Sequence, residues 1–110
     1  MEKYFAPICG ICTFAGFPYH EDLDTLDADA AVLGVPVDMG ACLRPGTRFG
    51  PKRIREASSS NSPMIDGNYD FERDTVYLHP SECKLADVGD VPVITGDLLG
   101  TDAYIEEYVR

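Results

Sequence analysis

The sequence contains no run of 18 apolar residues, so we expect no transmembrane helix. The first dozen residues hold a single lysine and no apolar stretch long enough for a secretory signal, and we therefore expect a cytoplasmic protein. Basic side chains are scarce, because 9 Lys and Arg accompany 19 Asp and Glu, and the formal net charge is -10. A nucleic-acid duplex or an anionic membrane surface would repel such a chain, so neither is an expected partner.

Only four cysteines are present, at positions 9, 12, 42 and 83. Because disulfides persist in oxidising compartments and no secretory signal is evident, we expect free thiols. Cys9 and Cys12 form a lone C-x-x-C pattern, which in redox proteins follows a strand and opens a helix. Proline and glycine neighbours indicate an irregular segment here, and no second such pair or His pair lies nearby for zinc. We therefore interpret the spacing as coincidental.

The apolar content of 45% is typical of a globular protein, and 110 residues suffice for one domain. Residues 1–28 are predicted to form an irregular N-terminal arm, because Pro and Gly interrupt every helical period. The unbroken apolar run at 30–35 predicts a strand buried on both faces, and a long loop follows. Gly-Pro at 50–51 predicts the start of a helix that ends at the serines 58–60, with Ile54 and Ala57 facing inward.

The second half of the chain is predicted to continue this alternation. Residues 75–78 predict a short strand at the edge of the sheet, and 85–88 predict a second core strand ended by a glycine. A helix is expected to begin at Thr101 or Asp102 and to carry apolar side chains at helical spacing. The predicted fold class is α/β, with 29–110 forming the first part of a parallel-sheet domain.

Basic residues concentrate around the predicted start of the first helix. Five of the nine lie between positions 44 and 55: Arg44, Arg48, Lys52, Arg53 and Arg55. Two of them fall in the first helical turn, where the macrodipole disfavours a cation by about 0.3–1 kcal/mol. We therefore expect anionic partners for this cluster, which are carboxylates of the chain itself, a neighbouring subunit or a ligand.

Three other patterns have both a chemical and a structural interpretation. The acidic run from His20 to Asp24, with further aspartates up to position 29, has oxygen ligands for a metal, but we favour a solvated acidic loop. Asp87 and Asp90 could act as an acid–base pair, but we favour hydrogen bonding at a strand-to-loop turn. The serines at 58–60 lack a G-x-S-x-G context and indicate a helix terminus.

The stretch from Gly34 to Arg55 resembles the ureohydrolase (arginase and agmatinase) family and is most similar to agmatinases. The family pattern is GVPxD and MG, followed by RPG, RFGP and IRE. Here it reads Gly34-Val-Pro-Val-Asp38-Met-Gly-Ala-Cys-Leu-Arg44-Pro-Gly-Thr-Arg48-Phe-Gly-Pro-Lys-Arg-Ile-Arg55-Glu. Upstream, GICTF at 10–14 resembles the GIxTF segment of the family, and DVGDV at 87–91 matches its DxGDV.

The resemblance implies the N-terminal part of a three-layer α/β/α domain around a parallel sheet. Family enzymes hydrolyse a guanidinium carbon–nitrogen bond with two Mn²⁺ ions and a shared hydroxide. Agmatinases convert agmatine to putrescine and urea, and relatives act on arginine or guanidinobutyrate. The metal ligands of the family lie in GGDH, DAHxD and DxDxxDP motifs, none of which occurs in this sequence. We therefore expect an N-terminal third that has no metal ligand or catalytic residue of its own and is inactive alone.

The loop at 36–48 is expected on the active-site side, because open α/β sheets bind ligands outside the carboxyl ends of their strands. Asp38, Arg44 and Arg48 are candidates for the active-site rim or for contact with a neighbouring subunit. The competing interpretation, which we favour, is that Asp38 and Arg44 pair to hold the loop or reach a neighbouring subunit. Expected partners are the rest of the ureohydrolase domain or homologous subunits, as in family trimers and hexamers, with agmatine binding only the complete enzyme. The alternative function is a non-catalytic module that binds a full-length ureohydrolase subunit.

Overall fold

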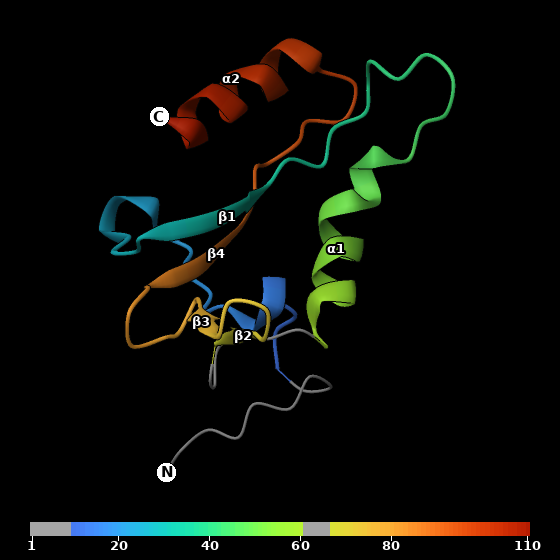
Figure 1. Ribbon diagram of the computed structural model, residues 1–110. Helices are drawn as coiled ribbons and strands as arrows, with labels where there is room; N and C mark the ends of the chain where they lie inside the picture. Colours follow the sequence, from blue (N-terminus) through green and yellow to red (C-terminus); the bar gives the residue numbers. More distant parts are fainter. Residues whose placement is uncertain (1–9, 61–66) are drawn as a thin grey trace.

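The computed structural model describes residues 10–60 and 67–110, and its centre is a parallel pair of strands (Figure 1). Strand β1 spans Ala30–Gly34 and strand β4 spans Leu85–Asp90, with Ala30 opposite Leu85. Both strands lie where their apolar runs predicted them. Helix α1, Gly50–Ser58, lies between them in the chain, so the order strand, helix, parallel strand confirms the expected α/β arrangement.

Helix α1 begins and ends as predicted, but its inward face is not the predicted one. Ile54 is 57% exposed and Ala57 is also exposed. The side turned toward the strands carries Pro51, Arg55 and Ser58, which are spaced four and three residues apart. The prediction followed apolar periodicity, whereas the rotation of this helix is set by polar contacts of Arg55 and Ser58. Its apolar side therefore remains open to solvent.

The N-terminal arm packs directly on β4. Its described part, residues 10–28, contains two short 3-10 turns, η1 at Phe14–Gly16 and η2 at Leu23–Thr25. A single parallel bridge joins Tyr19 to β4, beside the edge that β1 leaves free. Ala15 and Phe17 of the arm are buried against Leu85 and form the hydrophobic core with it. The irregular arm thus supplies core residues to the sheet.

A small antiparallel hairpin lies between α1 and β4 in the chain. It pairs strand β2, Asn68–Asp70, with strand β3, Thr75–Tyr77. The strand predicted at 75–78 therefore forms, but it belongs to this separate two-stranded sheet and is not an edge strand of the parallel pair. The sequence could not specify this, because the pairing of such a short strand depends on its partner.

Helix α2 spans Leu98–Val109 and lies beyond the end of the sheet that the two long loops leave (Figure 1). Its cap is Asp97, whose carboxylate accepts a hydrogen bond from the Gly100 N–H at 2.9 Å. The predicted start at Thr101 or Asp102 is therefore wrong. Thr101 is fully buried in the first turn, where its hydroxyl donates to the Asp97 carbonyl at 2.8 Å. Neither α1 nor α2 has the length and apolar character of a membrane span, and the rest of the described chain offers no longer helix.

Candidate functional site

The carboxyl ends of β1 and β4 meet at one closely packed joint. Gly34 ends β1 opposite Asp90 at the end of β4, and the Val91 N–H donates to the Gly34 carbonyl at 2.9 Å. A Cβ atom added to Gly34 would collide with the Asp90 carboxylate and with the ring of Pro51. The glycine of the GVP pattern is therefore required because a charged side chain lies directly against its backbone.

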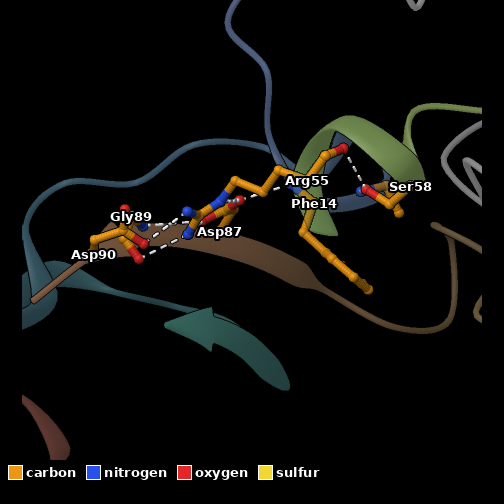
Figure 2. Close-up of polar contacts among 7 residues, drawn as sticks. Phe14, Arg55, Ser58, Asp87, Gly89 and Asp90 are labelled. Atoms are coloured by element: carbon orange, nitrogen blue, oxygen red, sulfur yellow. Dashed lines mark hydrogen bonds and ion pairs between the residues drawn. The ribbon is translucent and has the colours of Figure 1, made fainter. Parts of the chain in front are cut away.

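Arg55 of α1 binds the end of β4 through all three of its nitrogen atoms (Figure 2). Its Nε and Nη2 donate to the two carboxylate oxygens of Asp87, at 2.8 and 3.0 Å. Nη1 donates to Asp90 Oδ1 at 2.7 Å, and Nη2 also donates to the Gly89 carbonyl at 2.8 Å. The Arg55 side chain is only 11% exposed. This is the bidentate geometry in which a guanidinium binds a carboxylate most strongly.

Asp87 is 1% exposed, and every hydrogen bond it accepts favours its charged form. Besides Arg55, its carboxylate accepts from the backbone N–H groups of Phe14 at 2.7 Å and Gly89 at 2.9 Å. Burial raises the pKa of this carboxyl, but the bonds from Arg55, Phe14 and Gly89 outweigh burial and hold the pKa below its ordinary value. The hydrogen bond with Asp87 in turn raises the pKa of Arg55. Asp87 and Arg55 thus each stabilise the charged form of the other at this joint.

The same network fastens the arm to the helix. The Ala15 N–H donates to Ser58 Oγ at 2.8 Å, and that hydroxyl donates to the Arg55 carbonyl at 2.8 Å (Figure 2). The Phe14 N–H donates to Asp87, so η1 is attached to both α1 and β4. Three motifs far apart in the sequence, GICTF, IRE and DVGDV, therefore meet at the Asp87 carboxylate.

The loop between β1 and α1 has a clamp of its own, centred on Asp38. The Asp38 carboxylate accepts hydrogen bonds from Arg48 Nε at 2.8 Å and from the Gly46 N–H at 2.7 Å, and Arg48 Nη2 forms an ion pair with its Oδ1 at 2.7 Å. Its side chain is 2% exposed. The hydrogen bond from Arg48 lowers the pKa of Asp38 to about 2, against the opposing effect of burial and with help from the Gly46 and Arg48 N–H groups. The arrangement rigidifies the loop.

The clamp corrects one sequence interpretation and leaves another as a prediction. Asp38 pairs with Arg48 and not with Arg44, because the chain turns at Gly46, whose φ of 144° only glycine readily adopts. Arg44 lies exposed in the same loop, which leaves the carboxyl end of β1 as expected. The roles of Asp38, Arg44 and Arg48 at a rim or a subunit contact remain predictions.

Most of the basic cluster is neutralised by the chain's own carboxylates. Arg48 pairs with Asp38, Arg55 pairs with two carboxylates of β4, and Arg53 pairs with Glu56 on the surface of α1 at 2.7 Å. Of the three partner classes the sequence left open, internal carboxylates therefore account for these three arginines. Arg44 is left exposed near the end of the sheet.

The acidic run before β1 has local structural tasks. Asp22 accepts from the Asp24 N–H and caps η2, and Asp27 pairs with Lys84 at 2.6 Å. His20 Nε2 lies 3.1 Å from the Thr25 hydroxyl. The run is thus held by caps and a surface ion pair. Cys9 of the C-x-x-C pattern lies outside the described residues.

The two manganese ions of the family do not fit the side chains seen here. Across residues 10–60 and 67–110, no three His, Cys, Asp or Glu side chains are grouped to hold a metal. Asp87 and Asp90 both contact the Arg55 guanidinium, which occupies the position that a metal cation would take between them. The interpretation of Asp87 and Asp90 as turn residues is confirmed only in part. The Gly89 N–H does donate to Asp87, but both aspartates lie within β4 and bind chiefly Arg55.

Arg55 is the important residue that sequence reasoning missed. A usable signal was present, because Asp87 interrupts an apolar strand. A carboxylate buried in a strand needs a cationic partner, and an arginine in the adjacent crossover helix is the natural source. Periodicity in α1 directed attention to Ile54 instead.

Comparison with known proteins gives a consistent family. The model of the arginase family matches residues 28–110. A guanidinobutyrase from Pseudomonas aeruginosa is 41% identical over 105 residues, which cover 92% of this chain and 30% of the relative. An agmatinase from Bacillus subtilis is 40% identical over 86 residues, covering 76% of this chain and 26% of the relative. A human mitochondrial guanidino acid hydrolase is 34% identical over 105 residues, covering 96% and 27%.

A solved structure supports the same fold. Proclavaminate amidino hydrolase from Streptomyces clavuligerus superposes with a TM-score of 0.74 at 24% identity, over 96% of this chain and 32% of that one. The chain therefore has the fold of about one third of that enzyme, and it spans less than a third of the length of the curated relatives named above.

Proposed function

The chain belongs to the arginase family of ureohydrolases, and we propose that it forms the N-terminal part of an agmatinase-type enzyme domain. In this proposal it supplies the first strands of the sheet, the first helix and a rim loop. The convergence of three family-like motifs on the Asp87 carboxylate is the observation that carries it, because these contacts join the arm, the first helix and the second core strand into one scaffold.

Hydrolysis of a guanidino group would depend on residues beyond those described. When bound, two Mn²⁺ ions would supply the nucleophile and polarise the guanidinium carbon. The described residues contain no ligand set for them. We therefore expect the 110-residue chain alone to be inactive, and its contribution to the complete enzyme to be the placement of the rim.

Agmatine is the proposed substrate, and 4-guanidinobutyrate is the main competitor. The two differ at the end remote from the guanidinium, which carries an ammonium in agmatine and a carboxylate in guanidinobutyrate. Arg44 is exposed in the rim loop. The charge of Arg44 would attract a carboxylate at that remote end and repel the agmatine ammonium, so agmatine as substrate requires Arg44 to lie away from it. A rise in kcat/KM for agmatine on Arg44→Ala would contradict this placement.

The exposed apolar side of α1 favours a partner that covers it. Ile54 is 57% exposed on this helix, and β1 has exposed alanines at its start. Parallel sheets are normally covered on both faces. We propose that the rest of the ureohydrolase domain covers this surface. The alternative function, a non-catalytic module, would use the same surface to bind a homologous full-length subunit.

A chimera tests the proposal. Residues of this chain replace the matching segment of the Pseudomonas aeruginosa guanidinobutyrase, and urea release is measured with Mn²⁺ and either agmatine or 4-guanidinobutyrate. We expect a folded, active chimera and no turnover by the 110-residue chain alone. Turnover by the isolated chain above a metal-only blank would refute the expected inactivity, and a folded but inactive chimera would refute the scaffold role.

The module hypothesis makes a different prediction. A tagged 110-residue chain should then co-purify with the intact guanidinobutyrase and alter its oligomeric state in analytical ultracentrifugation. Substitution of Ile54 by Glu should abolish that association, whereas Arg53→Glu, which leaves the apolar side chain of Ile54 in place, serves as the matched control. Absence of any association would eliminate the module.

A further inference from the structure

The joint at the carboxyl ends of β1 and β4 has a consequence for the rim loop. We propose that Arg55 is a positioning residue, whose guanidinium sets the placement of the 35–49 loop at the edge of the active site. This inference rests on the proposed function, in which that loop borders the guanidino-binding site. It assigns Arg55 a task beyond the stability of the fold.

The Arg55 guanidinium contacts several residues along β4. It contacts Asp87 in the body of the strand, the Gly89 carbonyl near its end, and Asp90 at its last residue. Gly89 has a φ of 80°, so the strand departs from regular extended geometry between the two aspartates, where its register with β1 also shifts. One rigid, planar group therefore holds this irregular part of the strand. A lysine ammonium has neither the fork geometry nor the span to hold all three acceptors.

Asp90 links the end of β4 to the end of β1. The Asp90 carboxylate that binds Arg55 lies against the backbone of Gly34, and the Val91 N–H donates to the Gly34 carbonyl. The end of β1 is thus packed against a side chain that Arg55 holds in place. The orientation of Asp90 and the separation of the two strand ends depend on the same guanidinium.

Both ends of the 35–49 loop are attached to parts of the chain that Arg55 holds. The loop leaves β1 directly after Gly34 and enters α1 at Gly50, five residues before Arg55. The start of the loop is therefore held through Asp90, and its end is held by the helix that carries Arg55. Figure 1 shows the loop leaving the sheet at this end.

Between these ends the loop is internally rigid. Asp38 binds the side chain of Arg48 and the backbone of Gly46, so 38–48 forms a closed unit. A closed unit held at both ends moves as a body when its anchors move. Displacement of the Arg55 joint would therefore shift Arg44 relative to the sheet without opening the Asp38 clamp.

A merely stabilising role for Arg55 makes a different prediction. Loss of general stability would weaken every protected amide of the chain together. Loss of positioning would release the amide at the joint and leave the amide inside the clamp protected. The Val91 N–H, bonded to Gly34, reports the joint, and the Gly46 N–H, bonded to Asp38, reports the clamp.

Amide hydrogen exchange in the 110-residue chain distinguishes a positioning role of Arg55 from a merely stabilising one. The variants are Arg55→Lys and Asp90→Ala, because Asp90→Ala removes the link to Gly34 while leaving the buried pair of Arg55 with Asp87. Arg53→Lys, whose side chain is 76% exposed, is the matched control. We expect exchange at Val91 to accelerate about tenfold or more in both variants, with Gly46 changed by less than about twofold. Unchanged exchange at Val91, or equal acceleration at both amides, would overturn the inference.

The chimera with guanidinobutyrase supplies the functional readout. A misplaced rim weakens substrate binding more than the chemical step, so Arg55→Lys should raise KM about tenfold and lower kcat by less than about threefold. Arg53→Lys should change neither. An inactive parent chimera would count against the proposed function, whereas an active chimera indifferent to Arg55→Lys would count against the positioning role alone.

Discussion

The carboxylate of Asp87 and the guanidinium of Arg55 form a two-point ion pair between residues 32 positions apart in the chain. Asp87 is the first residue of the family-like DVGDV segment, and Arg55 closes the longer motif that begins at Gly34. The pair therefore explains physically why these two motifs occur together. A buried aspartate in the central strand requires the arginine, and the arginine in turn orients the helix.

Removal of the arginine should be costly. Arg55→Ala leaves Asp87 charged and buried without its main partner, and breaking one side of a buried pair costs about 3–5 kcal/mol. Arg53→Ala removes an exposed pair with Glu56 and should change the free energy of unfolding by less than about 1 kcal/mol. Urea unfolding followed by circular dichroism measures both. Equal effects of the two substitutions would contradict the burial argument.

The cavity left by Arg55→Ala should accept a guanidinium ligand. Ethylguanidinium has the same atoms that this substitution removes, and the carboxylates of Asp87 and Asp90 remain to bind it. We expect low millimolar ethylguanidinium to raise the unfolding midpoint of Arg55→Ala and to leave the Arg53→Ala control unchanged. Equal concentrations of ethylammonium chloride should have no such effect. Identical responses to both salts would show that the site is not specific for the guanidinium fork.

Replacing the whole pair with apolar residues should not restore stability. Such replacement is often neutral when the two charges satisfy only each other. Here Asp87 also accepts from the N–H groups of Phe14 and Gly89, which Arg55→Met/Asp87→Leu would leave buried and unsatisfied. Each orphaned donor costs about 1–3 kcal/mol. A double variant as stable as the parent in urea unfolding would disprove this account of Asp87.

Gly34 should tolerate no side chain while Asp90 is present. Gly34→Ala places a Cβ atom against the Asp90 carboxylate, and overpacking of this kind costs about 1–3 kcal/mol. Gly40→Ala, where a Cβ atom would meet open space, is the matched control and should change stability by less than about 0.5 kcal/mol. Combining Gly34→Ala with Asp90→Ala should recover part of the loss. Strict additivity of the two substitutions in thermal unfolding would contradict the close packing.

The Asp38 clamp predicts a distinctive titration. Hydrogen bonds from Arg48 lower the pKa of Asp38 to about 2 in the folded chain, against an unfolded value of about 3.9. The clamp is therefore fully stabilising above pH 3.9 and is lost as the pH falls toward 2. The carboxyl carbon of Asp38 should titrate near pH 2 by NMR, and Arg48→Ala should move that midpoint upward. An Asp38 midpoint near 4 in the parent chain would show that the clamp does not form.

Much of the fold follows from local sequence patterns. Strand β1 follows from an unbroken apolar run, β4 follows from a Leu-Ala-Asp-Val stretch ended by a glycine, and α1 follows from Gly50-Pro51 at its start and a serine run at its end. The start of α2 was misplaced because Asp97, Thr101 and Asp102 all have side chains that can cap a helix. The choice among them depends on Thr101 being buried, which periodicity does not reveal.

The candidate site was less predictable, since its contacts join distant segments. The sequence showed which loop leaves the end of β1, but it assigned Asp38 to Arg44 when Gly46 directs it to Arg48. The sequence predicted Ile54 inward because the spacing of apolar residues is the usual guide to the buried side of a helix, and one charged residue does not change that pattern. The rotation of α1 follows instead from the pair of Arg55 with Asp87, a contact that local propensity cannot encode.

The most direct test of the central claim is kcat/KM for Mn²⁺-dependent urea release by the chimera of this chain with guanidinobutyrase. Because the scaffold joint is intact, we predict kcat/KM within about tenfold of the parent enzyme for its better substrate, corresponding to less than about 1.4 kcal/mol of transition-state stabilisation. The 110-residue chain assayed beside it should release no urea. A folded chimera without activity, or urea release by the chain alone, would contradict the claim that these residues build the scaffold and rim of a ureohydrolase whose metal chemistry lies elsewhere.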